Sequence, residues 1–183
     1  MRQNQPDEEV QQDVPQPPPA ARRAKPALST YRRNLPHVQP ANRALFVTFS
    51  TWRGLALPEH VRDRVLEHCL HDHTSKLFMH AAVVMPDHVH LLFTPLSDDR
   101  GAQYGLAEIM GGIKGSSAHT VNRLVARSGR LWNVESYDHV VRLNEGIRQT
   151  AEYICRNPIR AGLAAHEDEY AWLWRQWVEG TEQ

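Results

Sequence analysis

Residues 83–95, VVMPDHVHLLFTP, predict two β-strands joined by a tight turn. The run that ends at Met85 is apolar and rich in β-branched residues, and the stretch after Asp87 has the same character. Pro86 and Asp87 lie between the two runs and are typical turn residues. The stretch therefore predicts a β-hairpin, and the rest of the chain can be arranged around it.

The second strand of this hairpin carries two histidines on one face. Side chains alternate across a strand, so His88 and His90 point together, with Cα atoms roughly 7 Å apart. Three apolar residues share the opposite face, which suits a core: Val89, Leu91 and Phe93. Two imidazoles at this spacing suit a divalent ion, but they also suit a solvated sheet face. A second triplet, His71-Asp72-His73, shows that the spacing alone is not specific.

Periodicity predicts further elements in the order β-α-β-β-α-β-α. The predicted strands are 44–52, 76–85, 88–95 and 136–143. Three helices are predicted: one starts at Pro58, the second covers about 104–127 and the third covers 144–157. Three glycines in the middle helix suggest the close approach of a ligand or, as in tight helix packing, of a neighbouring backbone: Gly111, Gly112 and Gly115. This order predicts an α+β fold, an antiparallel sheet with helices packed mainly on one face.

Composition divides the chain into three parts. Residues 1–30 are dominated by Pro, Gln and charge and predict a disordered extension. Residues 31–164 predict the folded domain, with sixteen Lys/Arg against twelve Asp/Glu, a surplus that permits contact with phosphates. The acidic, Trp-rich residues 165–183 predict a tail that packs on the domain.

Targeting and redox features favour the cytoplasm. No apolar run reaches the ~20 residues needed to cross a bilayer, so no membrane contact is expected. The N-terminus lacks a basic-then-apolar secretory pattern. Without export, Cys69 and Cys155 are expected to remain reduced thiols.

The last predicted helix carries a tyrosine and an asparagine outside its apolar stripe. Asn144 is expected as its N-cap, and Pro158 is expected to end it. The core-facing stripe contains four residues: Ile147, Ala151, Ile154 and Pro158. Tyr153 and Asn157 are one turn apart on a flank of this stripe, where a phenol and a carboxamide could serve one site. Each could also be an ordinary surface or turn residue.

Taken together, three stretches resemble a known family: VVMPDHVHLLFTP, LWNVESYDHVVR and AEYICRNPIRAGL. They are similar to the HUH single-strand transposases with one catalytic tyrosine, in particular the REP-associated tyrosine transposase branch. HUH denotes His-hydrophobic-His, here His88-Val89-His90, and the Tyr-x-x-x-Asn-Pro ending with Arg-Ala-Gly-Leu runs from Tyr153 to Leu163. The resemblance extends from about Tyr31 to Trp174 and implies a ferredoxin- or RRM-like HUH nuclease domain over residues 31–164.

The resemblance also implies an activity. Such proteins cut single-stranded DNA next to a hairpin without ATP or another nucleotide cofactor, here at repetitive palindromic elements. Tyr153 would be the nucleophile and would form a 5′-phosphotyrosine link beside a free 3′-hydroxyl. His88, His90 and Asn157 would hold one Mg²⁺ or Mn²⁺ ion. A self-contained monomer, cytoplasmic and associated with the nucleoid, is the expected state.

Alternatives remain at the level of both residues and function. Tyr137 is a rival nucleophile in a segment that looks extended. Six cations are predicted to contact DNA through their summed field: Lys114, Arg123, Arg142, Arg148, Arg156 and Arg160. The chain could instead be a catalytically silent module that binds hairpin DNA as a regulator. It could also be a metal-dependent hydrolase of RNA or small phosphoesters in which Tyr153 is structural.

Overall fold

The computed structural model describes residues 43–141 and 146–176, which belong to one compact unit, Val38–Gln183. The predicted extension 1–30 and the predicted domain start at Tyr31 lie outside the described residues, as do Arg142, Asn144 and Trp177. The elements in chain order are β1 Leu45–Ser50, η1 Trp52–Gly54, α1 Glu59–Leu70, β2 Leu77–Val84, β3 His88–Pro95, α2 Leu106–Leu124, β4 Tyr137–Val140, α3 Ile147–Cys155, α4 Asn157–Arg160, η2 Glu167–Glu169 and β5 Leu173–Arg175.

Five strands form one antiparallel sheet in the order β4-β1-β3-β2-β5. The first six major elements, β1-α1-β2-β3-α2-β4, follow the ferredoxin-like sequence of strands and helices. β3, which contains both histidines, is the central strand, with β1 and β2 as its neighbours. The predicted hairpin is therefore the middle of the sheet, and β5 extends the sheet on the β2 side.

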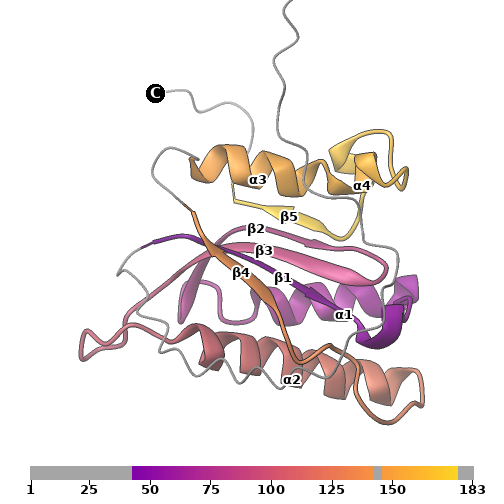
Figure 1. The fold of residues 1–183 in the computed structure, drawn as a ribbon, viewed down its shortest axis with the longest axis horizontal. Helices are drawn as coiled ribbons and strands as arrows, with labels where there is room; N and C mark the ends of the chain where they lie inside the picture. The colour runs from indigo at the N-terminus through magenta and orange to yellow at the C-terminus, as the bar shows by residue number, and fades with distance from the viewer. Residues whose placement is uncertain (1–42, 142–145, 177–183) are drawn as a thin grey trace, which may run out of the picture. The chain divides into compact units, whose positions relative to one another are not determined.

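Helices cover both faces of the sheet, with the two longest on the same face. Figure 1 shows α1 and α2 below the sheet and α3 with α4 above it. The main core lies between the sheet and the α1–α2 layer, and a smaller buried cluster lies under α3. The prediction of an α+β fold with an antiparallel sheet and helices mainly on one face is confirmed.

Alternation in β1 and β3 builds the main core. Leu45, Val47 and Phe49 of β1 are buried on the face that carries Leu91 and Phe93 of β3. A buried tryptophan, Trp132, packs edge-on against Phe49 with ring centroids 4.8 Å apart. Its indole N–H donates to the Ser117 hydroxyl of α2 at 3.0 Å, so the buried polar atom is satisfied. These contacts fix the sheet against α2.

The start of α3 differs from the prediction. Gly146 has a φ of 65°, and α3 begins directly after it, at Ile147, rather than after Asn144. A left-handed residue cannot continue an α-helix, and glycine adopts that conformation at little cost. Ile147, predicted to face the core, is 41% exposed because it starts the helix, whereas Ala151 and Ile154 are buried as predicted.

The glycines of α2 do not pack against a neighbour, so that expectation was wrong. A Cβ built on Gly111, Gly112 or Gly115 meets no atom within 4 Å outside the helix's own backbone. All three face solvent, while Ile109, Ile113 and other apolar residues of α2 form its buried stripe. The glycines weaken the helix without permitting a closer approach.

The C-terminal segment contributes an edge strand. β5 pairs with β2 through Ala81 and Val83, which face Arg175 and Leu173. The Tyr170 hydroxyl is buried and donates to the Val84 carbonyl oxygen at 2.8 Å. Both cysteines are buried free thiols, and no helix among the described residues is long and apolar enough to cross a membrane.

Removing the Tyr170 hydroxyl should destabilise the fold. In Tyr170→Phe the Val84 carbonyl keeps its burial and loses its donor, which is expected to cost about 1–2 kcal/mol of unfolding free energy. Tyr104→Phe is the matched control, because the Tyr104 hydroxyl has no hydrogen bond to the described residues and should change stability by less than about 0.5 kcal/mol. Urea denaturation measures both, and equal stabilities of Tyr170→Phe and the wild type would show that this hydrogen bond does not stabilise the fold.

Candidate active site

The face of the sheet under α3 carries the two histidines predicted from β3. Their rings lie 4.7 Å apart between centroids, with planes at 76°. His90 is only 8% exposed, whereas His88 lies at the start of the strand and is half-buried. The alternative of a solvated sheet face does not describe His90, because α3 and its neighbours cover it.

The Nδ1 atom of each histidine is hydrogen-bonded to a side-chain oxygen atom. His90 Nδ1 lies 2.7 Å from the Thr48 hydroxyl on β1, and His88 Nδ1 lies 2.7 Å from an Asp87 carboxylate oxygen in the turn. Such partners orient an imidazole and direct its other nitrogen to a ligand. Both Nε2 atoms are therefore the available ligating atoms.

Burial keeps His90 neutral. Loss of hydration is the larger cause and the neighbouring His88 the smaller one, and together they lower the pKa of His90 to about 3. A neutral imidazole keeps a lone pair for a metal ion, so the ring is in the ligating form throughout the physiological range.

The Phe46 ring contacts both His90 and the tyrosine of α3. The ring stacks on His90 with centroids 5.6 Å apart and planes at 20°. The same ring meets Tyr153 edge-on, with centroids 6.2 Å apart. Phe46 and Thr48 are both on β1, where the pairing with β3 sets Thr48 opposite His90. Tyr153 and His90 thus share one aromatic neighbour within a single chain.

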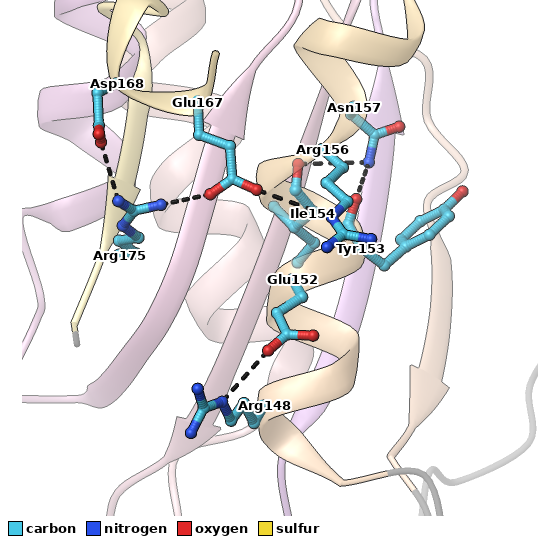
Figure 2. A network of polar contacts seen from close by, with 9 residues as sticks. All are labelled: Arg148, Glu152, Tyr153, Ile154, Arg156, Asn157, Glu167, Asp168 and Arg175. Carbon is cyan, nitrogen blue, oxygen red and sulfur yellow. Dashed lines mark hydrogen bonds and ion pairs between the residues drawn. The ribbon is translucent and has the colours of Figure 1, made fainter. Parts of the chain in front are cut away.

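The C-terminal end of α3 places Asn157 beside Tyr153. The Asn157 side-chain nitrogen donates to the Tyr153 carbonyl at 2.8 Å and approaches the Ile154 carbonyl at 3.4 Å. Pro158 has no N–H to offer Ile154, so the side chain takes over part of the helix bonding there. Figure 2 shows the Tyr153 ring and the Asn157 amide oxygen on the same side of α3, away from Arg175. That oxygen accepts no hydrogen bond from the described residues and can serve as a ligand.

A set of three metal-binding side chains on this face would have to include an amide oxygen. The described residues contain no group of three or more His, Cys, Asp or Glu side chains that could hold a metal. Two imidazole nitrogens with an amide oxygen are neutral ligands, which leave open positions for a phosphate and water.

The predicted cations differ widely in their surroundings. The Arg160 guanidinium lies 5.3 Å from the centroid of the Tyr153 ring, within cation–π range. Two other predicted cations face carboxylates: Arg148 pairs with Glu152 at 3.2 Å and Arg156 approaches Glu167 at 4.0 Å, as Figure 2 shows. Among the predicted cations that the structure describes, Arg160 is therefore the one that lies against the tyrosine ring.

Two further predicted cations belong to α2, on the opposite face of the sheet. Arg123 is exposed near the end of that helix. The Lys114 ammonium donates to the Val134 carbonyl and the Ser136 hydroxyl, each at 3.0 Å, and burial lowers the pKa of Lys114. Arg142 lies outside the described residues.

Tyr137, the rival nucleophile, also borders this face. It is 63% exposed on the edge strand β4, and its ring meets Phe46 edge-on with centroids 6.4 Å apart. The sheet register sets Thr48 between Tyr137 and His90. Phe46 and Thr48 as neighbours of the site were not predicted. The alternation in LFVTFS puts both on one face, but no local pattern in the sequence defines the register with β3.

Fold and sequence comparisons identify the family. Residues 46–157, more than half of the chain, match the family model described as "Transposase IS200 like". The chain therefore belongs to the IS200-like transposase family, and the family predicted from the three motifs is confirmed. A search of curated proteins finds no match.

Two solved structures are similar to the chain. A REP-associated tyrosine transposase bound to a REP hairpin is 20% identical with a TM-score of 0.58, over 80% of this chain and 82% of that chain. A putative transposase from Deinococcus radiodurans R1 is 22% identical with a TM-score of 0.45, over 66% of this chain and 94% of that chain. The first likeness establishes a common fold.

His90 should remain uncharged in mildly acidic solution. Because its pKa in the folded state is lowered from 6.5 to about 3, folding stability is full above pH 6.5 and falls as the pH drops below it. NMR of ¹⁵N-labelled histidine in EDTA should show no protonation of His90 between pH 8 and 5. A midpoint near 6.5 would contradict its burial under α3.

Proposed function

We propose that the chain is a metal-dependent single-stranded DNA endonuclease and strand transferase that acts through a 5′-phosphotyrosine intermediate. The observation that carries the proposal is the position of Phe46, whose ring contacts both His90 and Tyr153. This contact brings the nucleophile expected from the tyrosine motif to the histidine pair on the same face of one sheet. Both halves of the site come from one chain, which supports a monomer.

Tyr153 is the proposed nucleophile. Its hydroxyl oxygen attacks the phosphorus of a backbone phosphodiester, forms the new P–O bond and gives up its proton. The bond to the 3′-oxygen breaks, and that oxygen leaves as a free 3′-hydroxyl. The phosphotyrosine bond conserves the energy of the cleaved linkage for rejoining, so no ATP or other nucleotide is needed. Arg160 lies over the Tyr153 ring, where its charge can attract the incoming phosphate.

His88, His90 and Asn157 are the proposed ligands of one Mg²⁺ or Mn²⁺ ion. The partners of the two Nδ1 atoms and the free amide oxygen support this assignment. When bound, such an ion acts as a Lewis acid on a non-bridging phosphate oxygen. Thr48, Asp87 and Phe46 act on the ligands: they orient the two imidazole rings and limit the access of water to His90.

The proposed substrate is single-stranded DNA beside a hairpin, at repetitive palindromic elements. Three motifs resemble the REP-associated branch, and the chain shares its fold with a transposase solved with a REP hairpin. The exposed cations Arg123, Arg148 and Arg156, with Lys114 and Arg142, are proposed to add to the field that attracts phosphates. Action on the nucleoid in the cytoplasm follows from such a substrate.

Catalysis is tested most simply by removing the Tyr153 hydroxyl. With a labelled hairpin oligonucleotide and Mn²⁺, the wild-type chain should form a covalent adduct, and Tyr153→Phe should lower cleavage by at least about 1,000-fold. Tyr137→Phe, on the edge strand β4, is the control and should keep most activity.

Other outcomes of this assay identify other functions. Tight hairpin binding by the wild type without cleavage would favour the silent regulatory module. Undiminished cleavage by Tyr153→Phe without a covalent adduct would favour a hydrolase that uses water as its nucleophile, whereas an adduct would point to Tyr137.

The ligand assignment predicts a role for Thr48. Thr48→Val keeps the side-chain shape and removes the partner of His90 Nδ1, so Mn²⁺ affinity should fall about 10- to 100-fold. Electron paramagnetic resonance of free Mn²⁺ measures this without DNA. Thr94→Val is the control, because the Thr94 hydroxyl is hydrogen-bonded to His80, at the end of the β2–β3 hairpin away from the turn. Unchanged affinity in Thr48→Val would remove His90 from the ligand set.

A further inference from the structure

Two tryptophans on neighbouring loops have opposite environments. Trp132 is 4% exposed and belongs to the main core, whereas Trp52, in η1 directly after β1, is 36% exposed. Trp52 contributes no ring to either buried cluster of the sheet. A large aromatic side chain held at the surface without a role in the core is a candidate contact for a partner.

Two guanidinium groups flank the Trp52 ring. Arg130 lies 4.7 Å from the ring centroid and Arg53 lies 5.6 Å from it. Both arginines are exposed, and neither pairs with a carboxylate within the described part of the chain. The patch therefore combines an aromatic face with two cations whose charge is not neutralised locally.

The backbone holds this patch in place. The Trp52 N–H donates to the Leu131 carbonyl at 2.6 Å, and the Asn133 side chain donates to the Thr51 carbonyl at 3.1 Å. Arg53 adopts a left-handed conformation with a φ of 59°, and Gly54 follows at 70°. The two loops are thus joined by hydrogen bonds, and the turn keeps Arg53 beside the ring.

The patch lies at the histidine end of the sheet. Ser50, two residues before Trp52, is paired with His88, and the Thr51 N–H donates to the Asp87 carbonyl at 2.8 Å. A DNA strand with a phosphate at the proposed active site would therefore have nucleotides within reach of this end of β1.

We propose that Trp52, with Arg53 and Arg130, forms a stacking site for an unpaired base of the DNA strand that adjoins the hairpin. The inference rests on the proposed function and extends it to a second contact with the same substrate. Every base has a flat face that can stack on an indole, and each guanidinium can turn from the ring to a phosphate of the same strand. Such a site recognises single-stranded DNA with little dependence on sequence.

Base stacking can be tested in the full chain carrying Tyr153→Phe, which prevents cleavage. The probes are a hairpin with a single-stranded tail, with 2-aminopurine at successive tail positions, and the same hairpin without a tail. Trp52→Ala should weaken binding of the tailed hairpin about 5- to 150-fold and leave the tailless hairpin unchanged. One tail position should show quenched fluorescence that recovers in Trp52→Ala and stays quenched in Trp52→Phe.

Charge variants test the two arginines separately. Arg53→Ala and Arg130→Ala should each reduce the slope of log affinity against log salt by about one for the tailed probe. Arg64→Ala, whose guanidinium is paired with Glu67 on α1, should leave that slope unchanged. Circular dichroism should show that each variant remains folded.

The outcomes separate this inference from the proposed function. Equal affinity of Trp52→Ala and its parent for the tailed hairpin would overturn the stacking site and leave the proposed function intact. An equal loss on both hairpins would also overturn it, because the contact would then be with the duplex. Failure of the parent to bind either hairpin would overturn both proposals.

Discussion

The antiparallel register between β1 and β3 is the constraint on which the site depends. It sets Thr48 opposite His90 and Ser50 opposite His88, and leaves Phe46 one step further along the same face. A slip of one residue would move Phe46 and Thr48 to the other face of the sheet. The buried residues Val47 and Phe49 prevent this, because the same slip would expose them. Core packing on one face therefore fixes the polar arrangement on the other.

On the face of the sheet under α3, apolar side chains surround a few polar atoms whose orientations are fixed by hydrogen bonds. Phe46 and α3 exclude water from His90, which keeps that ring neutral, while Thr48 and Asp87 fix the two imidazole orientations. The break between α3 and α4 likewise fixes the orientation of the Asn157 side chain. Since Pro158 offers no N–H, the Asn157 nitrogen is bound to the helix end and its oxygen is turned outward. The restraints come from local packing and backbone chemistry.

Local patterns in the sequence were sufficient to predict β1 to β4 and α1 to α3 and to nominate the candidate residues, whereas β5, α4 and the two 3-10 helices were not predicted. Alternation gave the hairpin around Pro86, and the histidine and tyrosine motifs pointed to His88, His90, Tyr153 and Asn157. Long-range pairing was not predictable, because α1 separates β1 from β3 and no short turn defines their register. The same reason explains why the contacts of Phe46 were missed. Where α3 begins depended on the backbone of Gly146, and the solvent-facing glycines of α2 could not be distinguished from packed ones without the neighbouring helices.

In the proposed function Tyr153, and not Tyr137, reaches the scissile phosphate beside the histidine pair. Both phenols border Phe46, so proximity to that ring does not separate them. The direct measurement is peptide mass spectrometry of the protein–oligonucleotide adduct formed with Mn²⁺ and trapped before rejoining. We expect the nucleotide mass on the peptide that contains Tyr153. A nucleotide on Tyr137, or cleaved DNA without any linked peptide, would contradict it.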